Sequence, residues 1–149
     1  MEGNSVDDIL DFAIREEQAA GDFYTGLANN AGNSAMREAF LEFAREETAH
    51  KARLIAVKTG KSLMPAGAQT SDLKIADYTV DVTISDDMSY QDALIVAMKK
   101  EKAAFKMYTN LAAAATDAKV KETLLSLAQE EAKHKLRFEI EYDDLLRDM

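Results

Sequence analysis

The residues best suited to do chemistry in this chain are its two histidines, because both lie in the same local sequence. His50 belongs to EETAHKAR at 46–53 and His134 to EEAKHKLR at 130–137, two copies of the pattern E-E-x-x-H-K-x-R. A glutamate and a histidine three residues apart project from one face of a helix, where both could bind a metal ion. Two such pairs in a chain with only two histidines indicate a paired metal site.

The motif is part of a longer internal repeat with an offset of 84 residues. When residues 14–54 are set against 98–138 without a gap, 16 of the 41 positions are identical. The superposition pairs Tyr24 with Tyr108 as well as the two histidines. The chain is therefore a duplication of a helix-pair unit.

The composition of the chain excludes several classes of protein. The 149 residues carry a formal net charge of −9 and include no cysteine, which excludes disulfides, zinc ribbons and iron–sulfur or rubredoxin-type centres within the chain. The negative charge argues against nucleic acid and anionic membrane surfaces as partners. We find neither a signal-peptide pattern nor an apolar run of about 20 residues. We therefore expect a single cytoplasmic domain, spanning 1–149, that does not enter a membrane.

Four segments have apolar residues at alternating spacings of three and four, the period of helices in a bundle. The predicted helices lie near 5–31, 34–59, 89–115 and 118–147. Short links make 5–59 and 89–147 two antiparallel hairpins, which the long crossover 60–88 joins. The predicted fold is therefore all-α, a ferritin-like four-helix bundle made of two duplicated hairpins.

The crossover contains one patterned stretch. Apolar and polar residues alternate there, the apolar ones being Tyr78, Val80, Val82 and Ile84. This alternation predicts a short strand, which could lie across the bundle or pair with a second copy of the chain. An extended loop with one apolar edge fits the pattern equally well.

Six ionisable residues occupy positions on the apolar stripes that should face the core. They are Glu17, Glu47, His50, Glu101, Glu131 and His134. Four buried carboxylates without partners would each cost on the order of several kcal/mol in desolvation, and no lysine or arginine lies on the stripes to balance them. Two divalent ions would balance four carboxylates, with one glutamate from each of two helices and an E-x-x-H pair from each of the others. Carboxylate and imidazole ligands suit iron or manganese, although zinc could occupy the same site.

Residues next to these six have candidate supporting roles. Tyr24 and Tyr108 lie two turns after the single glutamates, where a hydroxyl could bond a ligating carboxylate and assist catalysis. Ordinary core tyrosines are the alternative. Glu46 and Glu130 are predicted to face solvent and to pair with nearby Arg and Lys. Because the histidines must be neutral to bind a metal ion, affinity should fall below about pH 6.

The helix motifs resemble a known family. EEQAAGDFYTGLA, EETAH, EKAAFKMYTNLA and EEAKH are similar to the di-iron domain of rubrerythrins, within the ferritin-like superfamily. The resemblance implies two iron ions held or bridged by the six residues, reductive cleavage of hydrogen peroxide by a diferrous site, and a homodimer. It does not extend to the rubredoxin domain, so electrons would come from a separate carrier such as a rubredoxin-type protein.

One departure from the family concerns the ligands. Rubrerythrins place an extra carboxylate three residues after the ligand of the third helix, whereas this chain has Ala104 there and Ala20 at the matching position of the first repeat. The remaining six-ligand set is closer to that of bacterioferritin ferroxidase centres. We expect a non-haem di-iron oxidoreductase that reduces hydrogen peroxide. The alternatives are a ferroxidase or iron-handling protein that oxidises Fe(II) with O2, and a structural bundle with an inert metal.

Overall fold

The computed structural model describes residues 6–60, 74–80 and 88–148. Four helices, α1 (Val6–Asn30), α2 (Ser34–Gly60), α3 (Tyr90–Ala114) and α4 (Ala118–Arg147), make up nearly all of this part, together with a short 3-10 helix, η1 (Ile75–Tyr78). The predicted helices end within one residue of the observed ones, and the predicted all-α fold is confirmed. None of the described helices is both long and apolar enough to span a membrane.

Polar residues in the links determine where three helices begin. The Asn33 side chain accepts a hydrogen bond from the Met36 amide at 2.8 Å in the first turn of α2. Ser89 and Asp117 cap α3 and α4 in the same way. Each such cap satisfies an amide that has no partner within the helix and contributes about 1 kcal/mol.

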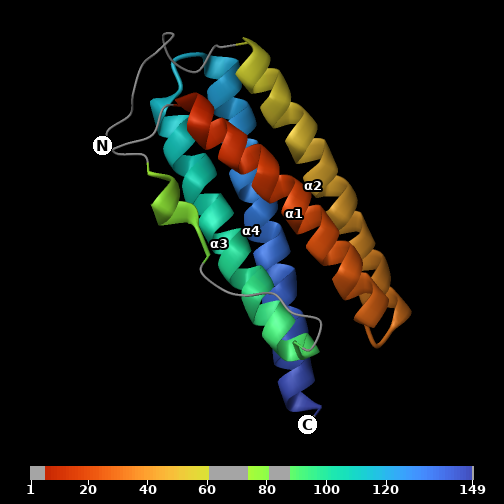
Figure 1. Ribbon diagram of the computed structural model, residues 1–149. Helices are drawn as coiled ribbons and strands as arrows, with labels where there is room; N and C mark the ends of the chain where they lie inside the picture. Colours follow the sequence, from red (N-terminus) through yellow and green to blue (C-terminus); the bar gives the residue numbers. More distant parts are fainter. Residues whose placement is uncertain (1–5, 61–73, 81–87, 149) are drawn as a thin grey trace.

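The helices form two hairpins that face each other. Helix α1 packs along α2 and α3 along α4, while the contacts between the hairpins are fewer (Figure 1). Helix η1 lies beside α3. Because the hairpins are repeats of one unit, matching residues approach the centre of the bundle from opposite sides.

The core has a polar layer between two apolar ones. One apolar cluster contains Leu10, Leu54 and Leu111, and the other contains Phe40 and Phe138. Between them lie the buried polar residues of the described chain, which are the six predicted ligands and no others. Each fully buried Leu or Phe contributes about 1.5–3 kcal/mol, so the two apolar layers offset the cost of burying charge between them.

The strand predicted in the crossover is wrong at its first residue. Tyr78 ends η1, whose turn is closed by a 3.0 Å hydrogen bond from the Asp77 amide to the Lys74 carbonyl. The Tyr78 ring is buried, and its hydroxyl accepts a hydrogen bond from the Asn110 side chain at 2.9 Å. The apolar residue therefore packs against α3 instead of a neighbouring strand. Positions 82 and 84 lie outside the described residues, none of which is in a strand.

Candidate metal centre

The four helices bring all six predicted ligands into one buried layer, in which each residue is at most 3% exposed. They form two groups of four, and within each group the ligand atoms lie within 4.8 Å of one another. The first group contains Glu17, Glu47, His50 and Glu131. The second contains Glu47, Glu101, Glu131 and His134. Glu47 and Glu131 belong to both groups. The arrangement could hold two adjacent ions bridged by these two glutamates, each completed by one further glutamate and one histidine.

Each histidine directs Nδ1 toward the glutamates and Nε2 away from them. His50 Nδ1 lies 3.3–3.5 Å from oxygens of the three glutamates in its group. His134 Nδ1 lies 3.2–3.6 Å from the corresponding three oxygens. The two rings are nearly parallel, with centroids 6.2 Å apart. Nδ1 is therefore the atom that would bind a metal ion.

Each of the six residues also has a buried polar atom that finds no hydrogen-bond partner within residues 6–60, 74–80 and 88–148. These atoms are Glu17 Oε2, Glu47 Oε1, His50 Nδ1, Glu101 Oε2, Glu131 Oε1 and His134 Nδ1. Buried polar atoms are nearly always hydrogen-bonded in folded proteins. Six exceptions that converge on one small volume fit a pair of bound cations, because a cation satisfies carboxylate oxygens and neutral imidazole nitrogens together.

The two repeat-matched tyrosines hold Glu17 and Glu101, the glutamates that α1 and α3 contribute. Tyr24 donates a hydrogen bond to Glu101, and Tyr108 donates one to Glu17. Each bond joins the two hairpins, because the tyrosine and its glutamate come from different ones. Burial and then the neighbouring carboxylate raise the pKa of both hydroxyls well above the usual value, so both remain donors. The sequence predicted a bond to a ligating carboxylate but not that it crosses between hairpins.

The buried residues shift one another's pKa strongly. Burial, followed by the charge of Glu131, raises the pKa of Glu101 to about 8 and that of Glu47 well above its usual range. Burial alone would lower the pKa of both histidines, but the surrounding carboxylates stabilise the protonated imidazoles and raise it to about 11 for His50 and about 10 for His134. Burial also acts to raise the pKa of Glu131, yet the two histidines lower it to about 2. The layer therefore favours positive charge at its centre.

Comparison with known proteins agrees with this centre. The rubrerythrin family model matches residues 8–142. The chain belongs to the rubrerythrin family. No curated protein matches it.

Solved structures show the same fold. A candidate ferritin-like diiron-carboxylate protein from Thermotoga maritima has a TM-score of 0.83 and 21% identity, with 96% of this chain and 97% of that chain covered. A hypothetical protein from Pyrococcus furiosus has a TM-score of 0.76 and 25% identity, with 96% and 91% covered. An uncharacterized conserved protein from Magnetospirillum magnetotacticum has a TM-score of 0.64 and 22% identity, with 95% of each chain covered. The helix bundle of this rubrerythrin-family chain is thus a ferritin-like fold.

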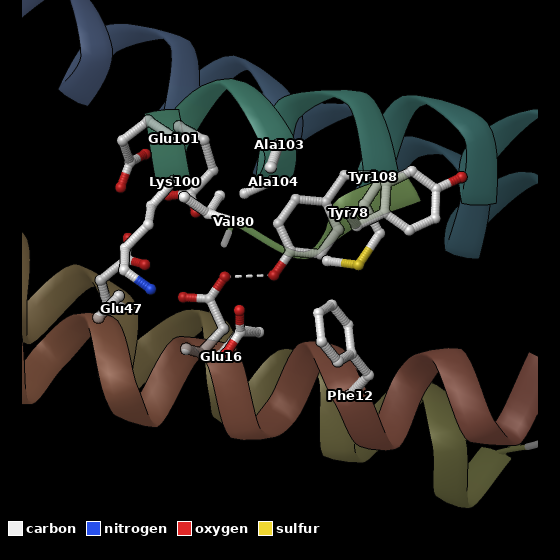
Figure 2. A pocket seen from close by; sticks show the side chains of 14 residues that line it. Phe12, Glu16, Glu47, Tyr78, Val80, Lys100, Glu101, Ala103, Ala104 and Tyr108 are labelled. Atoms are coloured by element: carbon white, nitrogen blue, oxygen red, sulfur yellow. Dashed lines mark hydrogen bonds between the residues drawn. The ribbon is translucent and has the colours of Figure 1, made fainter. Parts of the chain in front are cut away.

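A cavity of about 30 Å³ opens onto the polar layer between α1 and α3. Ala20 and Ala104 both line it, together with Tyr108 and the repeat-matched pair Glu16 and Lys100 (Figure 2). A bound water needs about 10–15 Å³ of such space, so the cavity has room for roughly two water-sized atoms. The small side chain at 104, where rubrerythrins carry an extra carboxylate, thus leaves space next to the ligands.

The outer glutamates of the motif were predicted to face solvent, and this prediction is only partly right. Glu130 does pair with Arg53 at 3.0 Å. However, Glu130 Oε1 also lies 3.2 Å from His50 Nε2, and Glu46 Oε1 lies 3.4 Å from His134 Nε2. Each outer glutamate thus faces the histidine of the other hairpin. The repeated glutamate doublet was the available signal, but helix periodicity places only its second member in the core.

Proposed function

We propose that this rubrerythrin-family protein is a di-iron oxidoreductase that reduces hydrogen peroxide to water with electrons from a separate carrier. The observation that carries the proposal is the pair of overlapping ligand groups that share Glu47 and Glu131. Hydrogen peroxide takes up two electrons and two protons to give two waters, and two adjacent Fe(II) ions can supply one electron each. Family membership supports iron in preference to manganese or zinc.

The protein's part in this reaction is to balance charge and fix geometry. The four buried glutamates would balance the charge of two divalent ions, and the Nδ1 atoms of the histidines would complete the ligand set. The Tyr24 and Tyr108 hydroxyls hold Glu101 and Glu17 in place. Ligands that are held before reaction need little rearrangement during it, which lowers the barrier to the chemical step.

The cavity beside Ala104 would receive the peroxide. Its volume of about 30 Å³ suits a molecule of two oxygen atoms. Glu16 and Lys100 lie on its wall outside the ligand set. In this proposal the two side chains pass protons from solvent to the departing oxygen atoms, which is the general acid catalysis that the reaction requires.

One observation favours a second candidate function, oxidation of Fe(II) by O2. Ala104 stands where rubrerythrins carry an extra carboxylate, and the six residues left resemble a bacterioferritin ferroxidase centre. A cavity of this size would admit O2 as readily as peroxide. The two functions therefore differ in their oxidant and not in their metal centre.

Stopped-flow mixing distinguishes the two functions. The metal-free protein is loaded anaerobically with two Fe(II) per chain and mixed separately with hydrogen peroxide and with O2, while the absorbance of ferric iron is followed. Oxidation by peroxide at least about tenfold faster than by O2 is expected, followed by turnover with reduced rubredoxin as the donor. Faster oxidation by O2 would support the ferroxidase, and iron that stays ferrous with both oxidants would contradict both functions.

A further inference from the structure

The two repeats have diverged in the shell of residues around their histidines. Within the motif five of the eight positions are identical, but just before it Ser126 of the second repeat corresponds to Glu42 of the first, and Leu127 corresponds to Phe43. Ser126 hydrogen-bonds to Glu130, and the Phe43 ring packs against the ring of His134. The two halves of the centre therefore share their proposed ligands and differ in what supports them.

His50 is held by a chain of hydrogen bonds. Its Nε2 lies 3.2 Å from Glu130 Oε1. The other oxygen of Glu130 accepts hydrogen bonds from Arg53 at 3.0 Å and from Ser126 at 3.2 Å, and Arg53 also donates to Ser126 at 3.3 Å. Because α2 carries Arg53 and α4 carries Glu130 and Ser126, this chain also fastens one hairpin to the other.

The matching chain does not form at His134. Glu46 Oε1 is 3.4 Å from His134 Nε2, which has no hydrogen-bond partner among the described residues. Arg137, the repeat mate of Arg53, donates instead to the sulfur of Met36 at 3.2 Å. Packing holds the His134 ring, since the Phe43 ring lies 4.2 Å away between centroids.

We propose that Glu130, held by Arg53 and Ser126, is a positioning residue for His50 alone, and that the metal position of His50 therefore binds more tightly than that of His134. The inference rests on the metal centre of the proposed function. A carboxylate that accepts the Nε2 proton fixes the tautomer with its lone pair on Nδ1 and makes Nδ1 a stronger donor. Packing against Phe43 orients the His134 ring, but it neither fixes the tautomer nor strengthens Nδ1 as a donor. Glu46 and Glu130 are almost equally exposed, at 33% and 29%, so the two halves differ in the hydrogen bond that Glu130 makes to His50 and Glu46 does not make to His134.

Zinc binding to the metal-free full chain tests this inequality by titration calorimetry. The wild type should show two binding events whose affinities differ by about tenfold. Glu130→Gln should weaken the tighter event by about 10–100-fold, the usual loss when such a partner is removed. The repeat-matched control Glu46→Gln should change neither event by more than about threefold. Circular dichroism should show unchanged helix content in both variants.

Nuclear magnetic resonance of the zinc-loaded protein separates positioning from a general effect on stability. One imidazole Nε2 proton, that of His50, should exchange slowly with solvent, and Glu130→Gln should abolish its signal. Arg53→Gln should speed its exchange, whereas the matched Arg137→Gln should not. Equal effects of Glu130→Gln and Glu46→Gln, or no effect of either, would overturn the inference and leave the metal centre standing. A wild type that binds no zinc would overturn both.

Discussion

Metal binding should expel several protons from this protein, because the buried residues hold protons that the ligated state cannot keep. The pKa values of about 11 for His50 and about 10 for His134 mean that both imidazoles are charged at pH 7. Each must release a proton before Nδ1 can ligate. The pKa of about 8 for Glu101 adds most of a third proton, and the pKa of Glu47, raised by burial and by the charge of Glu131, acts in the same direction.

The expected total is about three protons released for every two divalent ions bound at pH 7. The protons that leave thus offset most of the four positive charges that enter with the ions. The affinity for the ion pair should then rise by about three powers of ten for each pH unit near neutrality. The sequence alone predicted a fall in affinity only below about pH 6, which assumed the ordinary histidine pKa of 6.5.

Titration calorimetry with zinc measures the proton count directly. The observed enthalpy is plotted against the ionisation enthalpy of several buffers at pH 7, and the slope is the number of protons released. His134→Ala provides the comparison, since it should bind one ion and release about two protons fewer, those of His134 and Glu101. Release of less than one proton per two ions in the wild type would show that the imidazoles are neutral, and would refute the charge balance derived for the layer.

Three further perturbations have definite expected results. The stability of the metal-free protein should fall as pH rises from about 6.5 to about 10, because the raised pKa values of His50 and His134 favour the folded state only while these groups stay protonated. The free energy of unfolding should fall by up to about 1.4 kcal/mol per pH unit for each histidine. A melting temperature that rises over this range would contradict this prediction. His134→Ala should leave a helical bundle that binds one iron per chain by elemental analysis, and retention of both ions would contradict its role as a ligand. Ala104→Leu should fill the cavity and slow oxidation by peroxide by at least about tenfold at unchanged iron content; an unchanged rate would show that peroxide enters elsewhere.

Much of the site was predictable because the spacing of apolar residues in each helix shows which face of that helix is buried. The stripe through Leu10, Glu17 and Tyr24 has the same period as an ordinary core stripe, so a charged residue on it is conspicuous. The same helical periodicity placed the second glutamate of each doublet in the core. Local periodicity therefore sufficed for the helices and for the six residues that meet in the layer.

What the sequence could not supply depends on how the hairpins pack against each other. Hydrogen bonds such as that from Tyr108 to Glu17 cross between hairpins, and so does the approach of Glu130 to His50. Neither is encoded in the period of a single helix. The error at Tyr78 has a similar origin, because a buried tyrosine at the end of a 3-10 turn gives the same alternation as the start of a strand.

Anomalous diffraction from crystals of the Fe(II)-loaded protein would test the two-ion centre most directly. Two iron peaks per chain are expected, about 3.5–4 Å apart, each contacting both Glu47 and Glu131 and one of the two histidines. A single peak, or two peaks that share neither glutamate, would contradict the bridged pair on which the proposed chemistry depends.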